Sequence, residues 1–210
     1  MIRPALPDHV GDPVSSPSVV NVPNGLTMMR LLLVPVFAWL LLREGGDEAS
    51  SRVWAAAVFL VASATDLVDG ELARRQGQVT TFGKVADPIA DKILVIGTLI
   101  ALIRTKELEI PLWAVFIIVI RELLIGGVRV IAGSQGKVLA ADRWGKIKTA
   151  VQLIVIQIIL GIVILKDRDV AASWMVRSAY PMTVLCAVLA LSSLGAYLRQ
   201  YRAMLEKSWS

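Results

Sequence analysis

Six long apolar stretches follow one another along the chain, separated by short polar segments. They cover about 26–42, 53–73, 83–103, 110–132, 147–165 and 174–198, and most approach the roughly 20 residues that a helix needs to cross a bilayer. The first stretch is short, so we expect its helix to begin near Asn24. The pattern predicts an all-α integral membrane protein with six transmembrane helices, which form one membrane domain over residues 23–210.

The composition agrees with this prediction. Of 210 residues, 56% are hydrophobic, whereas an ordinary soluble domain has about 45–50% apolar residues. Residues 1–22 are rich in proline, serine and glycine, which predicts a flexible tail. The single histidine, His9, lies in this tail, so histidine-based catalysis and metal binding are excluded. The single cysteine, Cys186, excludes an intramolecular disulfide and is interpreted as a small buried hydrophobe.

The placement of basic residues predicts the orientation. With six spans both termini lie on one side, and the loops and ends on that side hold more arginine and lysine than those on the other side. Cytoplasmic segments of membrane proteins carry such an excess. We therefore expect a multi-pass protein of the cell membrane whose N- and C-termini, tail included, are cytoplasmic. No nucleic-acid partner is expected.

Four aspartates lie at the edges of the second and third apolar stretches: Asp66, Asp69, Asp87 and Asp91. One acid inside a transmembrane segment costs about 2.5–3.5 kcal/mol on insertion scales, so four unpaired acids would cost roughly 10 kcal/mol. Two divalent cations would balance four carboxylates. Oxygen ligands of this kind favour magnesium, manganese or calcium, and the sequence therefore predicts a metal site at the cytoplasmic ends of helices two and three.

Helical spacing places these acids on two matched faces. An arc of about 140° on the second helix holds Asp66, Asp69, Gly70, Ala73 and Arg74, and an arc of about 80° on the third holds Gly83, Asp87 and Asp91. The small residues would let a bulky ligand approach the backbone. Two alternatives are that the acids are helix caps at a membrane boundary, or that they form the transit site of a divalent-cation transporter. Against transport, the acids gather at one end and no polar path continues across the bilayer.

The run D-x2-D-G-x2-A-R-x8-G-x3-D-x3-D, which we call the signature (residues 66–91), resembles that of the CDP-alcohol phosphotransferases at every position. The resemblance implies a membrane enzyme that transfers a phosphatidyl group from CDP-diacylglycerol to an alcohol and releases CMP. It implies two Mg²⁺ or Mn²⁺ ions on Asp66, Asp69, Asp87 and Asp91. Asp91 is also the implied general base, which accepts the proton of the attacking hydroxyl. The residues themselves leave a covalent phospho-aspartate open, and only the resemblance favours direct attack.

The same resemblance implies a nucleotide site on the first three helices. Gly70, Ala73, Arg74 and Gly83 of the signature would line the nucleotide, although glycines also serve close helix packing. The segment P-N-x-x-T-x-x-R at the start of the first helix is similar to that of phosphatidylglycerophosphate synthases, where its polar residues face the nucleotide and metals. Here these residues are Asn24, Thr27 and Arg30. The alternative is that Asn24 caps the helix and Arg30 snorkels to the interface.

Basic residues of the fourth and fifth spans are candidates for binding an acceptor phosphate. Arg121 interrupts a long apolar run, and Arg129 lies two turns later on the same face. Lys146 and Lys148 point about 200° apart, so one could face the site while the other meets lipid headgroups. Charge-assisted hydrogen bonds suit phosphate, but cytoplasmic flanking charge is the competing interpretation for both lysines. Glu122 could simply neutralise a neighbour.

The acceptor implied by these flanking segments is sn-glycerol 3-phosphate, because they look like those of the bacterial phosphatidylglycerophosphate synthases. The implied product is phosphatidylglycerophosphate. Cardiolipin synthases of the same superfamily carry a similar G-K-x-x-T stretch, here beginning at Gly145, and are the alternative. The family resemblance also implies a homodimer, and the lipid substrate implies an opening between helices toward the bilayer.

Overall fold

The computed structural model describes residues 22–45, 47–76, 81–105, 108–134 and 143–209. Side chains within these ranges are described except at 22–24, 66–76, 81–88, 91, 130–134, 143–144, 200 and 203–209. The tail predicted for residues 1–22 therefore falls outside the description, apart from the backbone of the first helical residue.

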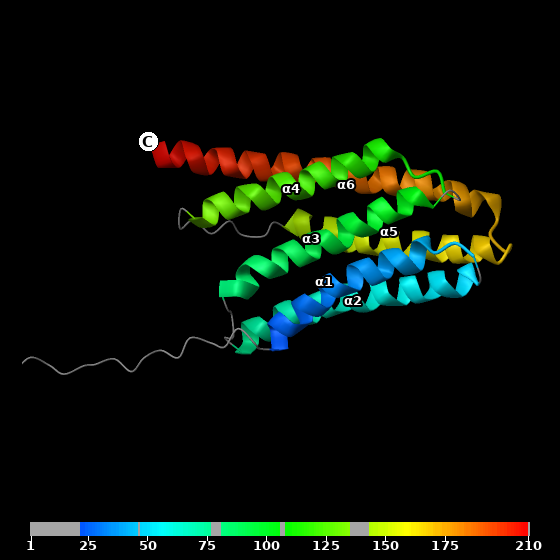
Figure 1. Cartoon of the computed structure of the whole chain (residues 1–210). Coiled ribbons are helices and arrows are strands. Elements are labelled where there is room, and N and C mark those ends of the chain that lie inside the picture. Colours follow the sequence, from blue (N-terminus) through cyan, green and yellow to red (C-terminus); the bar gives the residue numbers. More distant parts are fainter. Residues whose placement is uncertain (1–21, 46, 77–80, 106–107, 135–142, 210) are drawn as a thin grey trace, which may run out of the picture.

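Six helices make up the described part of the chain (Figure 1). They are α1 (Val22–Leu42), α2 (Glu48–Gln76), α3 (Thr81–Arg104), α4 (Leu112–Ser134), α5 (Arg143–Asp167) and α6 (Ser173–Trp209). Each coincides with one of the six apolar stretches, although α4 begins two residues after the start of the stretch 110–132, so the all-helical prediction is confirmed. Most extend beyond the apolar stretch at one or both ends, because polar residues that favour helix continue the apolar run.

The helices run back and forth along one direction as an elongated bundle (Figure 1). α1 packs on α2 and α3, α6 packs on α4 and α5, and α2 contacts α5 between these groups. α1 begins and α6 ends at the end of the bundle where α2 ends and α3 begins. We call this the signature end, because it carries residues 66–91, and the other the opposite end.

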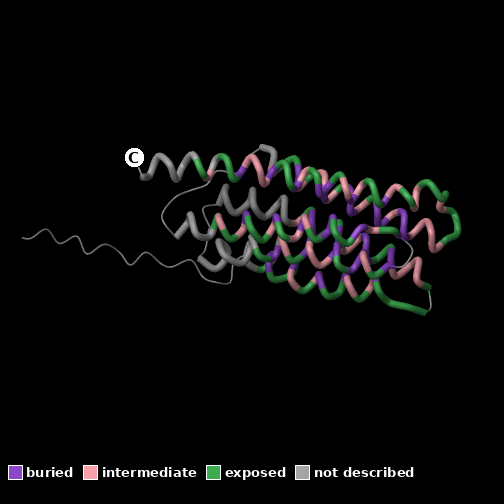
Figure 2. Tube along the Cα trace, turned by 90° about the horizontal axis from the view of Figure 1, so that it is seen from above, coloured by how far each residue is buried: buried purple, intermediate pink, exposed green. Residues whose placement is uncertain are grey.

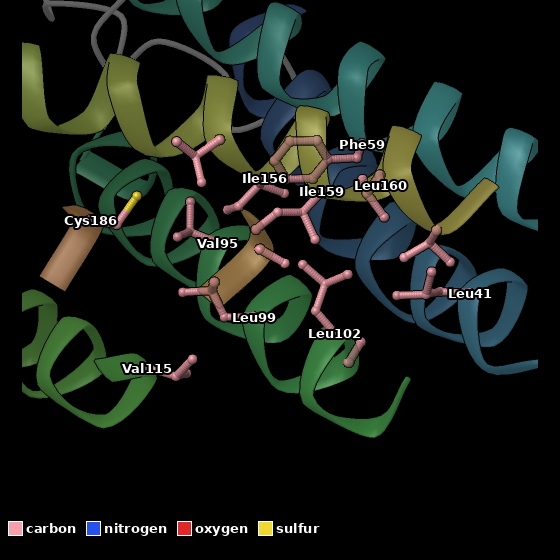
Figure 3. Close-up of a cluster of buried hydrophobic side chains, with 14 of the residues drawn as sticks. Leu41, Phe59, Val95, Leu99, Leu102, Val115, Ile156, Ile159, Leu160 and Cys186 are labelled. Atoms are coloured by element: carbon pink, nitrogen blue, oxygen red, sulfur yellow. The ribbon is translucent and has the colours of Figure 1, made fainter. Parts of the chain in front are cut away.

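Buried apolar side chains from all six helices form one core (Figure 3). Phe37 of α1 packs against Phe59 of α2, with the two ring centroids 6.0 Å apart, and Leu41 of α1 belongs to the same core. Further core residues come from α3 to α6, among them Leu99, Leu102, Val115, Ile156, Ile159, Leu160 and Cys186. Cys186 is buried, as expected for a small apolar residue. Fully burying a side chain such as Leu or Phe stabilises a fold by about 1.5–3 kcal/mol.

Exposed positions lie along the outward faces of the helices (Figure 2), and many of them carry large apolar side chains. Leu32 of α1 and Phe116 of α4 are more than half exposed, which is typical of a surface in contact with lipid. Three helices of the described chain are long and apolar enough to cross a membrane: α1, α5 and α6. Exposed tryptophans lie within two turns of the opposite end, at Trp39, Trp54 and Trp174, and tryptophan is enriched where a membrane protein meets the lipid–water boundary.

Candidate active site

A cavity of about 780 Å³ opens between α2, α3, α4 and α5. One part of its wall is apolar and includes Leu60, Ile125, Leu153, Ile154 and Ile158. The other part is charged and includes Lys92, Arg121, Glu122, Arg129 and Lys146. Among the described lining residues the basic side chains outnumber the acidic one by four to one, and this part of the wall is suited to bind an anion.

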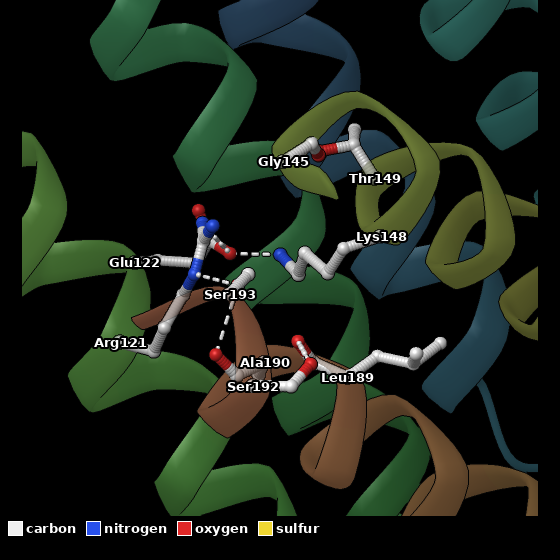
Figure 4. Close-up of polar contacts among 9 residues, drawn as sticks. All are labelled: Arg121, Glu122, Gly145, Lys148, Thr149, Leu189, Ala190, Ser192 and Ser193. Atoms are coloured by element: carbon white, nitrogen blue, oxygen red, sulfur yellow. Dashed lines mark hydrogen bonds and ion pairs between the residues drawn. The ribbon is translucent and has the colours of Figure 1, made fainter. Parts of the chain in front are cut away.

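Arg121 and Lys148, two of the predicted phosphate-binding residues, are joined by one carboxylate (Figure 4). Oε1 of Glu122 accepts a hydrogen bond from Nη1 of Arg121 at 3.1 Å and another from Nζ of Lys148. Nε of Arg121 also donates to Oγ of Ser193 on α6, at 3.0 Å. Three helices thus fix two cations in the bundle interior. The interpretation of Glu122 as a neutralising neighbour is confirmed, and it neutralises two neighbours.

The two lysines of the G-K-x-K segment occupy different environments, because they point to different sides of α5. Lys148 is only 3% exposed, whereas Lys146 is exposed and lies at the cavity wall. Arg129 of α4 lies at the same wall, with its guanidinium carbon 5.8 Å from the centre of the Tyr197 ring on α6. A cation over an aromatic face is attracted by the ring. The four predicted acceptor residues therefore gather in one region of the molecule.

Lys92 of α3 completes the charged wall and was not a predicted site residue. Its side chain crosses α4 at Gly126, where an added Cβ would lie 2.8 Å from Cε of Lys92. Glycine at this position therefore leaves room for the lysine stem. The sequence carried one signal for Lys92, since it directly follows the signature aspartate Asp91. No signal in the sequence indicated that Ser193 contacts the site, since α6 contains several serines.

Two polar residues of α1 face the bundle interior. Thr27 and Arg30 are each 1% exposed. Arg30 therefore does not reach the interface along the outside of the bundle, as the snorkelling alternative required. A buried arginine is retained where it meets polar or charged partners. The third predicted residue of this face, Asn24, has a side chain that lies outside the described residues.

The signature residues lie on α2 and α3, with side chains outside the described residues: Asp66, Asp69, Gly70, Ala73 and Arg74 on α2, and Gly83, Asp87 and Asp91 on α3. Their described neighbours are informative. Ser63 and Ala64 of α2 line the cavity just before Asp66, and Lys92 lines it just after Asp91. The cavity thus reaches the helix segments that carry the predicted metal ligands, and four carboxylates are a donor set that fits hard divalent cations.

Residues 20–191 match the CDP-alcohol phosphatidyltransferase family. The match covers most of the chain, so the protein belongs to this family of enzymes.

Relatives carry more particular names. The CDP-diacylglycerol–glycerol-3-phosphate 3-phosphatidyltransferase of Bacillus subtilis is 40% identical over 149 residues, which are 67% of this chain and 76% of the relative. A probable phosphatidylglycerophosphate synthase of Mycobacterium tuberculosis is 39% identical over 173 residues, 81% of this chain and 79% of the relative. A CMP-forming cardiolipin synthase of Streptomyces coelicolor is 37% identical over 112 residues, 53% of this chain and 51% of the relative.

Proposed function

We propose that the protein transfers the phosphatidyl group of CDP-diacylglycerol to sn-glycerol 3-phosphate, which gives phosphatidylglycerophosphate and CMP. One observation supports this most directly. A single cavity combines an apolar wall with a cationic wall and reaches the helix segments of the signature. Such a cavity suits one substrate with acyl chains and a second, small substrate with a phosphate. The names of the Bacillus and Mycobacterium relatives agree with this acceptor.

The cationic wall is the proposed acceptor site. Arg121 and Lys148 would bind the phosphate of glycerol 3-phosphate, with Arg129 and Lys146 nearer the open side of the cavity. A phosphate monoester carries about two negative charges at neutral pH. Arginine in particular binds phosphate oxygens in a fixed, often bidentate geometry. With the phosphate held there, the rest of the small acceptor lies within the cavity toward α2 and α3.

The reacting groups belong to the signature. Asp66, Asp69, Asp87 and Asp91 would hold two Mg²⁺ or Mn²⁺ ions, which when bound supply positive charge to the diphosphate. The acceptor oxygen attacks the phosphorus that carries the diacylglycerol group, the phosphoanhydride bond breaks, and CMP leaves with the bonding electrons. Asp91 takes the proton of the attacking hydroxyl. Asn24, Thr27, Arg30, Gly70, Ala73, Arg74 and Gly83 would hold the nucleotide.

The apolar wall is the proposed lipid site. Leu60 on α2 and Ile154 and Ile158 on α5 line the cavity and are suited to contact acyl chains, and a lipid would enter the cavity from the bilayer between helices. We further propose that all six helices span the cell membrane, with both termini and the signature end at the cytoplasm, where CDP-linked substrates occur. The working form proposed is a homodimer, on the basis of the family resemblance.

The second candidate is a cardiolipin synthase, in which phosphatidylglycerol replaces glycerol 3-phosphate. The similarity to the Streptomyces enzyme favours it.

A purified preparation offered labelled CDP-diacylglycerol with glycerol 3-phosphate, phosphatidylglycerol or inositol phosphate would separate these functions. We expect CMP release with glycerol 3-phosphate. Release with phosphatidylglycerol alone would establish the second candidate, and cation uptake into liposomes without CMP release would point to a transporter.

Metal removal is a further prediction of this proposal. A chelator should reduce CMP release to background, because the diphosphate then lacks its counter-charge, and added magnesium or manganese should restore it. Activity should be measured with glycerol 3-phosphate at several chelator concentrations. Full activity in excess chelator would contradict the proposed role of the four aspartates.

A further inference from the structure

Glu122 places a carboxylate oxygen between two cations at the proposed phosphate site. Oε1 lies 3.1 Å from Nη1 of Arg121 and in hydrogen-bond contact with Nζ of Lys148. An anionic oxygen that bridges a guanidinium and an ammonium is also the arrangement in which these groups bind a phosphate oxygen. The carboxylate therefore occupies a position that a phosphate oxygen of the acceptor would take.

The cations of this cluster are more deeply buried than the acid. The side chains of Lys148 and Arg121 are 4% and 8% exposed, whereas that of Glu122 is 14% exposed, and both Arg121 and Glu122 line the cavity. Ser193 accepts a hydrogen bond from Arg121 independently of Glu122. Arg121 therefore keeps one of its partners if the carboxylate turns away, and open space lies next to the carboxylate.

The surrounding charge is suited to exchange of anions. Lys92, Arg129 and Lys146 line the same cavity, so a phosphate that enters meets an excess of positive charge among the described lining residues. A carboxylate carries one negative charge and a phosphate monoester about two. The phosphate can thus replace the carboxylate on the two cations. Removing one partner of a buried ion pair is unfavourable, which is why an internal anion is useful when the acceptor site is empty.

We propose that Glu122 is an exchangeable internal counter-ion of the acceptor site. It holds Arg121 and Lys148 in place before the acceptor binds and gives up this position to the acceptor phosphate. It returns when the lipid product, which retains that phosphate, leaves. The inference rests on the proposed function for the identity of the acceptor. It makes Glu122 a positioning residue that weakens phosphate binding and assists product release.

The test is the variant Glu122→Gln, which keeps the shape of the side chain and removes its charge. Binding of inorganic phosphate to the detergent-solubilised full chain would be measured from its thermal stabilisation at increasing phosphate concentration. We expect phosphate to bind about tenfold more tightly to the variant, since its internal competitor is gone. The KM for glycerol 3-phosphate should fall, inhibition by product should strengthen, and the KM for CDP-diacylglycerol should stay unchanged.

Two further variants separate this role from a structural one. Glu109→Gln removes one exposed acid from the opposite end and should leave phosphate binding unchanged, which excludes a general effect of net charge. In a Lys148→Met background, Glu122→Gln should lose most of its effect, because the two residues act on the same site. If Glu122→Gln does not fold, Glu122→Asp should shift phosphate binding in the same direction by a smaller factor.

If Glu122→Gln binds phosphate as tightly as the wild type, or more weakly, the inference is wrong. Such a result would mean that Glu122 does not compete with phosphate and has a structural or directly binding role. The phosphate measurement needs no turnover. If the wild-type protein fails to use glycerol 3-phosphate but Glu122→Gln still tightens phosphate binding, the proposed acceptor is wrong while the counter-ion role stands.

Discussion

The two ends of the bundle each hold a buried arginine paired with an acid, and the pairs differ in charge balance. At the opposite end, Nη1 of Arg52 on α2 donates to Oδ1 of Asp167 on α5, and Nη2 of Arg52 lies 3.5 Å from Oε2 of Glu48. At the signature end, Arg121 and Lys148 share the single carboxylate of Glu122. Among the described side chains in these contacts, one cation pairs with two acids in the first cluster, and two cations pair with one acid in the second.

The cavities beside the two clusters show the same contrast. The cavity at the opposite end is about 310 Å³, and its described charged lining is two acids and two bases: Glu44, Glu48, Arg52 and Arg104. The larger cavity at the signature end has an excess of basic residues in its described lining. A buried arginine with two carboxylates has its charge fully compensated and needs no further anion, whereas two cations on one carboxylate beside open space are suited to bind an anion from outside.

The largest effect expected at the signature end comes from Asp91→Asn. An amide cannot take the proton of the attacking hydroxyl, so we predict that turnover falls by about a thousandfold. Binding of CDP-diacylglycerol should largely persist. Steady-state CMP release and lipid binding would be measured side by side, with Asp47→Asn at the opposite end as the control that keeps turnover. Normal turnover of Asp91→Asn would remove Asp91 as the base.

Arg52→Met should destabilise the fold at the opposite end of the bundle. The change leaves the largely buried Asp167 without its arginine, and loss of one partner of a buried ion pair costs about 3–5 kcal/mol. We predict a clearly lower midpoint of thermal unfolding in detergent. Molecules that remain folded should keep the wild-type KM for glycerol 3-phosphate. A raised KM for glycerol 3-phosphate with unchanged stability would show that Arg52 contributes to substrate binding. The distinction between a structural cluster at Arg52 and a binding cluster at Arg121 would then be wrong.

Arg121→Met should produce the reverse pattern at the signature end. Hydrogen bonds to charged groups contribute about 1.5–3 kcal/mol, so the KM for glycerol 3-phosphate should rise about 10- to 100-fold. The KM for CDP-diacylglycerol should change little. The thermal midpoint should fall less than in Arg52→Met, because Glu122 keeps Lys148 as its partner. Equal KM values for wild type and variant would show that the acceptor phosphate binds elsewhere.

The smallest effect concerns Asp47, which precedes α2 at the opposite end. Hydrogen bonds from the hydroxyl and the backbone N–H of Ser50 lower the pKa of its carboxyl. A lowered pKa contributes stability above the ordinary aspartate pKa, and this stability is lost as the pH falls through the lowered value. We therefore predict that Asp47→Ala has a slightly lower midpoint temperature of unfolding than the wild type at neutral pH. The difference between the two midpoints should become smaller at acidic pH. Thermal unfolding at several pH values would measure it, and a difference that grows in acid would contradict this assignment.

Much of the fold could be predicted from the sequence because the relevant information is local. The six apolar stretches specify six helices, and within the described residues α1, α5 and α6 are long and apolar enough to cross a bilayer. The spacing of the signature aspartates specifies two helix faces at one end of the chain's second and third helices. Helix ends were less predictable, since polar residues extend α2 to Gln76 and α6 to Trp209.

The acceptor region could be predicted only as a set of candidates. Arg121 and Lys148 were recognisable from the sequence as candidates for the acceptor phosphate, but helical spacing alone could not show which of Lys146 and Lys148 faces the bundle interior. The rotation of α5 about its axis decides between them, and the rotation depends on how α5 packs on α2 and α6. The same packing brings Glu122 to Lys148, which is 26 residues away in the sequence.

By itself, the sequence determined that the chain is helical, that it belongs in a membrane, and which aspartates and basic residues could take part in chemistry, because hydrophobic length and helical periodicity act over neighbouring residues. The tertiary structure decided which charges meet. It joined Arg121 to Ser193 across 72 residues and Arg52 to Asp167 across 115. Side chains so far apart in the chain come together only when whole helices pack against one another. The low dielectric constant of the interior then strengthens the electrostatic interaction between the paired charges.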